Sequence, residues 1–422
     1  MCSSVDEQGR SRTNRAKWRT WASEDLNFKR WIDRLSRQSA VTGQEYPRVL
    51  QRFLDKHNLT PAGLVQKAKR ARRQVEDTLD DFISTLEREG KAPSYIGNYT
   101  KTIKSWLKFN EIVLVREFRV ANRGLTPSLK DERIPTKDEL KAILNAASPR
   151  GRAIISMVAF SGVRPGVLGN FHGTDGLRLK DLPELVLEKK QVTFTKIPAL
   201  IVVRPELSKI RRKYLTFLAS EGCDYLKMYL DLRLAAGEIL DSDAAVIAVA
   251  PSALGRGPRK GREDGHGTIA TKNVTSDIRD AMRRAGHTWR PYVLRSYFAT
   301  SLLVAEGHVG LPLHYRVFWM GHKSGIGMEW AYTVGKNHLP AEFIEEMRTK
   351  FAAAEQYLTT TGRPPVAAID REALDALATV QEAFEADPAN LARFFGEFLK
   401  CMNVGVTDAA AAIAQLEKEA QP

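Results

Sequence analysis

The sequence predicts a mainly helical α+β protein with a small antiparallel β-sheet. Apolar residues recur at helical spacing through most of the chain, as in Asp80–Leu86, where Gly90 ends the pattern. Only residues 190–218 change to the alternation and β-branched content of strands. The length of 422 residues suits two or three domains.

The first third of the chain divides into an arm and a helical domain. Residues 1–24 are polar and basic and are expected to form a flexible basic arm. Residues 25–120 are expected to form a compact helical domain, since the helical pattern runs from Leu26 to about Asn110. Its last helix is predicted to open at Ser94 and to carry its apolar residues on one side, namely Ile96, Tyr99, Ile103, Trp106 and Leu107.

Residues 111–135 have the Gly and Pro content of a linker, and a second domain is predicted over 133–360. Thr136 is a candidate helix cap, and the helical pattern runs to Phe160. Strands are expected around Val192, Phe194 and Ile197, over Leu200–Val203, and over Tyr214–Phe217. A Gly/Pro/Arg loop over 251–268 follows, and then helices from Lys272 to about Tyr357.

Pro364 and Pro365 separate a last segment from this domain. Residues 365–422 are predicted to form a helical acidic extension, with helical patterning over 370–420. The extension either mediates assembly between protomers or caps the same chain, and the sequence leaves both alternatives open.

The charge points to a polyanionic partner. The net charge is +14 and the isoelectric point is about 9.6. Residues 1–130 carry +11, residues 131–360 carry +8, and residues 361–422 carry −5. The first two segments are therefore expected to face nucleic acid, and the tail is not.

The cysteines and the hydropathy pattern indicate a reducing, non-membrane environment. Cys2, Cys223 and Cys401 are far apart and odd in number, which excludes a disulfide framework and a CxxC metal pair. The N-terminus lacks an apolar signal core, and no apolar run has the length of a membrane span. We expect a cytoplasmic protein that associates with the nucleoid when bound to DNA.

Four short stretches are candidates for chemistry. Arg164 follows a glycine in Ser161–Gly166, and Lys209 lies between two predicted strands in Leu207–Tyr214. Tyr292 and Arg295 are three residues apart on a predicted apolar helix, where an arginine needs an anionic partner. The fourth stretch is Phe318–His322, followed by Tyr332. Each stretch alone is also compatible with a solvated turn, a surface arginine or a packed aromatic residue.

Together and in this order, these stretches resemble the tyrosine recombinase (integrase) family over about residues 45–355. The resemblance rests on Ser-Gly-Val-Arg-Pro, Leu-Arg-x-x-Phe-Ala-Thr and Met-Gly-His…Tyr-Thr. It implies a core-binding domain at 25–120 and an integrase-type catalytic domain at 133–360. It also implies that Arg164 and Arg295 clamp a phosphate. The hairpin lysine of the family would be Lys209, with Lys213 as second choice. The nucleophile would be Tyr332, and His322 would be the histidine beside it.

Two positions depart from the family pattern. Tyr292 stands where a histidine is usual, so we expect a hydrogen bond rather than proton shuttling from this residue. Tyr332 follows His322 by ten residues, one more than is usual, and Gly325 and Gly327 between them can absorb the extra residue.

The implied reaction is site-specific cutting and rejoining of double-stranded DNA through a 3′-phosphotyrosine. No cofactor is expected, since two arginines and a lysine supply the charge and the chain has no phosphate-binding GxxxxGK[ST] loop. Candidate phosphate contacts, each also compatible with a solvated face, are Lys67, Lys69, Arg70, Arg72, Arg73, Arg211, Arg212, Lys213, Arg256, Arg259, Lys260 and Arg262.

Two other functions stay open: a non-catalytic sequence-specific DNA-binding protein on the same scaffold, and an activity like that of type IB topoisomerases. The resemblance further implies self-association, as a tetramer on DNA. The long tail and the 251–268 insertion favour a mobile-element integrase over a compact chromosome-resolving enzyme.

Overall fold

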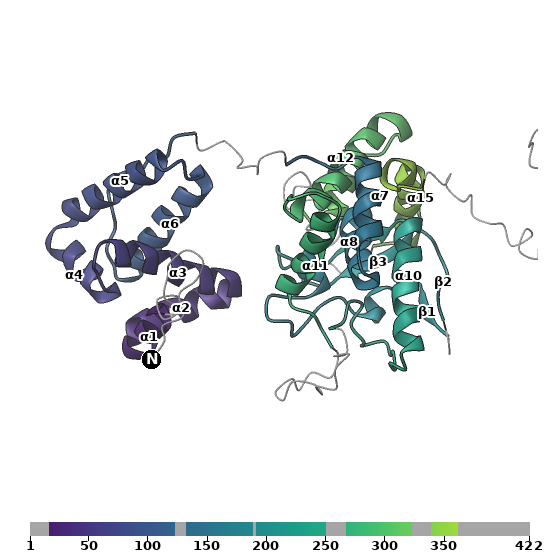
Figure 1. Ribbon diagram of the computed structural model, residues 1–422, viewed down its shortest axis with the longest axis horizontal. Coiled ribbons are helices and arrows are strands. Elements are labelled where there is room, and N and C mark those ends of the chain that lie inside the picture. The colour runs from purple at the N-terminus through teal and green to yellow at the C-terminus, as the bar shows by residue number, and fades with distance from the viewer. Residues whose placement is uncertain (1–16, 123–131, 189–190, 250–266, 323–338, 362–422) are drawn as a thin grey trace, which may run out of the picture. The chain divides into compact units, whose positions relative to one another are not determined.

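The computed structural model of the chain describes residues 17–122, 132–188, 191–249, 267–322 and 339–361 (Figure 1). Helices dominate these residues, and the strands form two small antiparallel sheets, which confirms the predicted mainly helical α+β class. The described residues build two hydrophobic cores, one from residues between 18 and 118 and one from residues between 140 and 358.

Six helices surround the first core: α1 Lys17–Glu24, α2 Leu26–Gln38, α3 Ala40–Lys56, α4 Pro61–Arg70, α5 Arg72–Arg88 and α6 Pro93–Phe109. Its centre is aromatic. The rings of Trp31 and Trp106 lie 5.3 Å apart, and Phe28 packs edge-on against Trp106 at the same distance. The predicted helix from Ser94 is confirmed, with Pro93 in its first turn.

The prediction of a flexible arm over 1–24 is wrong for residues 17–24. They form α1, whose Trp18 and Trp21 are each only 8% exposed and join the first core. The two tryptophans are three residues apart and so share a helix face. Residues 1–16 lie outside the described residues.

The beginning of the predicted linker packs on the first core. Leu114 and Phe118 are buried there. The backbone amides of Val115 and Arg116 both donate to the carboxylate of the buried Glu76, at 2.7 and 3.2 Å. This carboxylate fixes the chain as it leaves α6.

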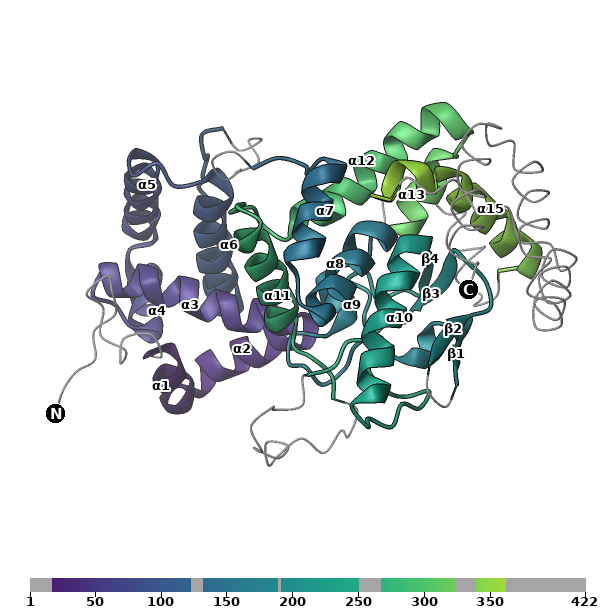
Figure 2. The ribbon, with the colours of Figure 1, turned by 45° about the vertical axis from the view of Figure 1, so that its right-hand side comes forward.

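The second core is built by α7 Lys137–Ala146, α8 Pro149–Ser161, α9 Pro165–Leu168, the 3₁₀ helix η2 Leu179–Asp181, α10 Ser220–Ala235, α11 Thr271–Arg284, α12 Tyr292–Val309, α13 Leu313–Trp319 and α15 Ala341–Leu358. Helix α8 is central and contacts α7, α10, α11 and α12 (Figure 2). Every side chain from Ala153 to Ser161 is buried. The predicted cap at Thr136 is confirmed as a capping box with Glu139.

Four strands form two separate sheets rather than the single sheet predicted. The strand β1 Leu185–Leu187 pairs with β2 Val192–Phe194, and β3 Ala199–Val203 pairs with β4 Tyr214–Leu218. The prediction of a strand at Ile197 is wrong. The chain turns between β2 and β3, and this turn leaves Ile197 49% exposed. Residues 204–213 connect β3 to β4 and include the predicted Lys209.

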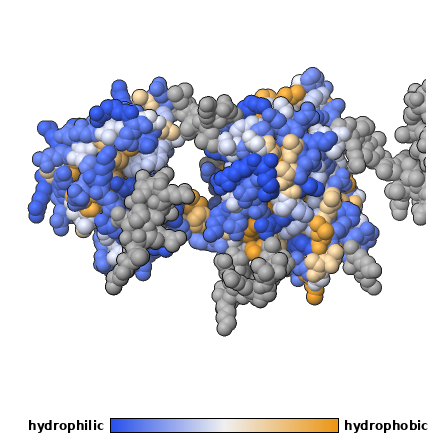
Figure 3. Space-filling model, viewed as in Figure 1, coloured by the Kyte–Doolittle hydropathy of each residue, from blue (hydrophilic) through white to orange (hydrophobic). Residues whose placement is uncertain are grey.

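The surface is mostly polar. On the face shown in Figure 3, hydrophilic residues cover most of the described surface, and apolar residues form small separate groups. None of the described helices is long and apolar enough to cross a membrane. The predicted helical segment 370–420 and most of the loop 251–268 lie outside the described residues.

Candidate active site

Arg295 is the centre of the candidate site. It lies one turn into α12 and is fully buried. Its Nη1 donates to the carbonyl of Gly162, and its Nη2 donates to the carbonyl of Met320. Two chain segments that end helices, the α8 end at Gly162 and the α13 end at Met320, therefore hold this guanidinium from two sides.

Two glycines make this convergence possible. Gly162 ends α8 with a φ of +69°, and Gly321 follows Met320 with a φ of +57°. Both values lie in the left-handed region that favours glycine. A Cβ on Gly162 would lie 2.4 Å from the ring of Phe298, so the chain has room for no side chain there.

Arg164 approaches the same Met320 carbonyl that Arg295 binds, and His322 contacts Arg295 directly. Arg164 is the N-cap residue of α9, and its Nη1 lies 3.5 Å from that carbonyl oxygen. The Nε2 atom of His322 lies 3.3 Å from Nη2 of Arg295. Three of the residues predicted from the sequence thus meet, although they come from three separate segments of the chain.

The electrostatics of this cluster favour an anion. Burial first, and then the charge of Arg164, lower the pKa of Arg295 to about 10. Burial also lowers the pKa of His322 to about 4, with Arg295 and Arg164 adding to the shift. Within the described residues, neither arginine is in an ion pair with a carboxylate. Two close cations without a counter-charge are suited to bind a phosphate.

The depressed pKa of His322 has a measurable consequence. Its titration midpoint should lie near pH 4 rather than the ordinary 6.5, so the free protein holds a neutral imidazole at pH 7. Between pH 6.5 and 4 the unfolded chain takes up a proton that the folded chain does not, so falling pH in this window lowers the free energy of unfolding. Added inorganic phosphate should raise the midpoint, because a bound anion stabilises the imidazolium.

Histidine-detected NMR, with the peak assigned by His322→Gln, measures both effects. A midpoint near 6.5 that phosphate leaves unchanged would show that His322 does not face an anion site.

Tyr292 is the first residue of α12 and is 60% exposed. Hydrogen bonding and charge interactions with Tyr292 oppose the lowering of the pKa of Arg295, which places its hydroxyl beside the guanidinium. Tyr292 therefore borders the arginine cluster from the solvent side, as the spacing of the two residues predicted.

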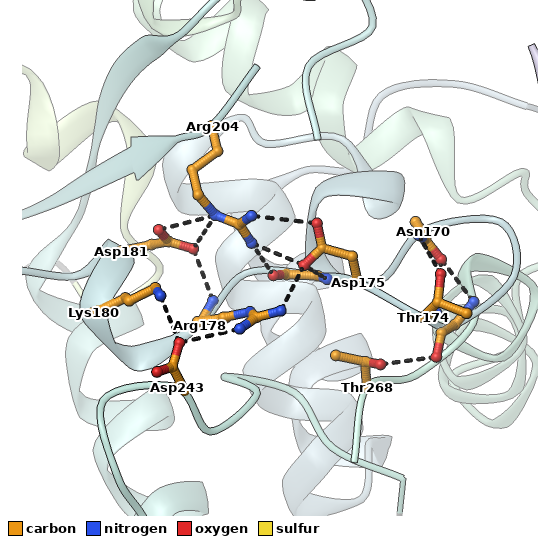
Figure 4. A network of polar contacts seen from close by, with 11 residues as sticks. Asn170, Thr174, Asp175, Arg178, Lys180, Asp181, Arg204, Asp243 and Thr268 are labelled. Atoms are coloured by element: carbon orange, nitrogen blue, oxygen red, sulfur yellow. Dashed lines mark hydrogen bonds and ion pairs between the residues drawn. The ribbon is translucent and has the colours of Figure 1, made fainter. Parts of the chain in front are cut away.

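Lys209 lies on the β3–β4 connection and is exposed. Within the described residues, no ion pair or hydrogen bond ties it to Arg164, Arg295 or His322. The base of the connection is rigid, because Arg204 binds the carboxylates of Asp175 and Asp181 at 2.9 and 3.1 Å (Figure 4). Arg178 and Lys180 extend the same network to Asp243.

The remaining sequence candidates divide into two groups. Tyr332, Arg256, Arg259, Lys260 and Arg262 lie outside the described residues. The others lie on helix ends or on the β3–β4 connection, and none forms an ion pair within the described part of the chain; they are Lys67, Lys69, Arg70, Arg72, Arg73, Arg211, Arg212 and Lys213. Among the described residues no group of three or more His, Cys, Asp or Glu could hold a metal ion.

Sequence reasoning missed two basic helix faces on the first core. Arg30, Arg34 and Arg37 on α2 are exposed and follow one helix face. Lys101 and Lys108 are exposed on one face of α6, and Lys104 on the same face is half-buried over the ring of Phe118. Helix α6 packs against α2 through Trp31 and Ser105 at 3.1 Å. None of the six is in an ion pair within the described residues. The available signal was their spacing of three or four residues, rather than a run of adjacent charges.

No protein-family profile matches the chain, and no curated protein matches it significantly. Among solved structures, it is similar to the XerA recombinase, with 21% identity over 77% of this chain and 98% of that one and a TM-score of 0.32. The integrase from mycobacterium phage Brujita gives 18% identity over 81% of this chain and 94% of that one, with a TM-score of 0.33. Lambda integrase residues 75–356 bound to DNA give 16% identity over 74% of this chain and 97% of that one, with a TM-score of 0.41. These are distant similarities.

Proposed function

We propose that the chain is a site-specific DNA recombinase that cuts and rejoins DNA through a covalent phosphotyrosine. The observation that supports this most is the meeting of Arg164 and Arg295 at the carbonyl of Met320, with His322 against Arg295 and no carboxylate among the described residues paired to either arginine. A phosphodiester in this site would gain fixed donors for the charge that develops on its oxygens in the transition state.

In the proposed reaction, the hydroxyl oxygen of Tyr332 attacks the phosphorus and the bond to the 5′-oxygen breaks. A 3′-phosphotyrosine and a free 5′-hydroxyl result, and the ester conserves the bond energy for rejoining. The neutral imidazole of His322 accepts the phenol proton, and Lys209 donates a proton to the leaving oxygen. No step needs a metal or ATP.

Covalent trapping tests this function. The protein is incubated with nicked duplexes of randomised sequence, from which a short fragment diffuses away after cleavage and prevents rejoining. A complex that survives a denaturing gel, and that Tyr332→Phe does not form, is the expected result. Duplexes that are bound without a covalent complex would favour the non-catalytic DNA-binding alternative, and relaxation of supercoils without site preference would favour the topoisomerase alternative.

DNA binding is expected to use the cations of the first core that form no ion pair within the described residues. Replacing Arg30, Arg34 and Arg37 together by alanine should make the fall of log affinity with log salt less steep. The slope should decrease in magnitude by about 2–3, near 0.9 for each lost phosphate contact. Replacing Lys17, Arg48 and Lys56 is the matched control, because each is already in an ion pair. Titrations at several salt concentrations measure both slopes. Equal changes in the two variants would mean that only net charge matters.

Self-association on DNA, as a tetramer of a mobile-element integrase, is part of the same proposal. Deleting residues 365–422 and measuring the mass of the DNA complex in solution tests the contribution of the extension. Unchanged assembly would assign the extension to the same chain.

A further inference from the structure

A buried tyrosine that the proposed reaction does not use lies inside the arginine cluster. Tyr214 is the first residue of β4, and its side chain is fully buried. Among the described residues, its hydroxyl has no hydrogen-bond partner. A buried hydroxyl without a partner is uncommon and indicates a role that the folded chain alone does not satisfy.

The ring of Tyr214 lies directly against Gly321. A Cβ on Gly321 would stand 2.7 Å from Cε1 and 2.9 Å from Cζ, the carbon that carries the hydroxyl. Gly321 separates Met320, whose carbonyl holds Arg295, from His322, which contacts Arg295. The hydroxyl end of Tyr214 is thus packed under the chain segment that positions both residues.

The same hydroxyl interacts electrostatically with the two arginines. Burial raises the pKa of Tyr214, and Arg295 and Arg164 are the groups that oppose this rise. In return, Tyr214 opposes the lowering of the pKa of Arg295. Tyr214 therefore interacts with both guanidinium groups, although it comes from strand β4, and Arg295 and Arg164 come from α12 and the start of α9.

Arg295 has a matching unsatisfied donor. Its two Nη atoms bind carbonyls, but its buried Nε has no partner in the part of the chain that the structure describes. An Nε–H group can only donate, and a phenol oxygen can accept. The cluster thus contains an unpartnered donor and an unpartnered acceptor on two side chains that interact electrostatically.

We propose that Tyr214 is a positioning residue: when a phosphate binds at the cluster, the Tyr214 hydroxyl accepts from the Nε–H of Arg295, both unpartnered within the described residues of the free protein, and so fixes the guanidinium. Tyr214 also directly follows Lys213, so β4 couples the β3–β4 connection to the arginine cluster. The role deepens the proposed function and rests on its phosphate site, but inorganic phosphate can occupy that site, so the role can be measured without DNA.

The direct test uses NMR of arginine-labelled protein, with the Nε–H signal of Arg295 assigned by Arg295→Lys. Tyr214→Phe keeps the ring against Gly321 and removes only the hydroxyl. With saturating inorganic phosphate present, it should speed solvent exchange of this Nε–H by about tenfold, the effect of losing one ordinary hydrogen bond. Tyr229→Phe is the matched control, because Tyr229 is a buried tyrosine of the same core whose hydroxyl binds the amide of Ala248 at 3.2 Å. Exchange unchanged in Tyr214→Phe would overturn the proposal.

Cleavage supplies a second test that identifies the partner through which Tyr214 acts. Single-turnover cleavage by Tyr214→Phe should fall about tenfold, with unchanged DNA affinity. A substrate with sulfur in place of the bridging 5′-oxygen has a leaving group that needs no proton. It should rescue Lys209→Ala but not Tyr214→Phe, because Tyr214 acts through Arg295.

Rescue of Tyr214→Phe by sulfur would place its action at the leaving group and contradict the proposal. Complete loss of the covalent complex in Tyr214→Phe, with retention in Tyr332→Phe, would make Tyr214 the nucleophile instead. If the wild-type protein cleaves no DNA, the proposed function fails, and the exchange measurement still decides the role of Tyr214.

Discussion

Arg295→Lys is expected to lower the rate of covalent complex formation by about 10²–10³-fold, the usual effect of losing a fixed donor to the transition state. Lysine keeps the positive charge but lacks the planar fork of arginine. It cannot hold the carbonyls of Gly162 and Met320 and still present a donor beside His322. The affinity for DNA should change little, because many other cations contribute to it.

The control for this substitution is Arg233→Lys. Arg233 is 7% exposed and donates to the carbonyls of Ala245 and Val246, so it is a buried, carbonyl-binding arginine like Arg295. It lies in α10 and also pairs with Glu238, away from the arginine cluster. Both variants should lose stability, and only Arg295→Lys should lose cleavage when both are assayed well below their unfolding temperatures. Equal losses of cleavage in the two variants would mean that Arg295 contributes to folding only.

Gly162→Ala is expected to cost about 2–4 kcal/mol of unfolding free energy, because a left-handed alanine is strained and overpacking of a core adds to the cost. The new methyl group would lie 2.4 Å from the fully buried ring of Phe298. Displacement of this segment would also move the carbonyl that holds Arg295, so cleavage should fall even where the protein stays folded.

Gly310→Ala separates strain from steric overlap. Gly310 ends α12 with a φ of +61°, close to the +69° of Gly162, but a Cβ there would meet nothing within 4 Å. We expect a loss of about 1 kcal/mol for this variant, from backbone strain alone. Urea denaturation measures both values. A similar loss in the two variants would mean that Phe298 yields at little cost.

Local patterns predicted much of the fold. The capping box at Thr136, the helix starting near Ser94 and the strand starting at Tyr214 each depend on neighbours within a few residues. The division into two sheets was not predictable in this way, because it depends on which strands meet in space. Helix α1 was missed because basic residues around Trp18 and Trp21 masked a two-residue apolar face.

The candidate site was predictable in its residues and not in its contacts. The order of motifs singled out Arg164, Arg295 and His322, and the structure brings these three together. Nothing in the sequence near Tyr214 distinguishes it from an ordinary strand residue. Its position depends on the missing side chain of Gly321, far along the chain, and such a contact appears only when the segments are packed.

The central claim is that Tyr332 forms the covalent bond to DNA. The most direct measurement is mass spectrometry of the trapped complex after digestion with nuclease and trypsin. The three candidate tyrosines fall in different peptides: 214–227 with Tyr214, 285–295 with Tyr292, and 324–336 with Tyr332. We predict that the nucleotide remnant lies on peptide 324–336. A remnant on either of the other two peptides, or none in a complex that survives denaturation, would contradict the account.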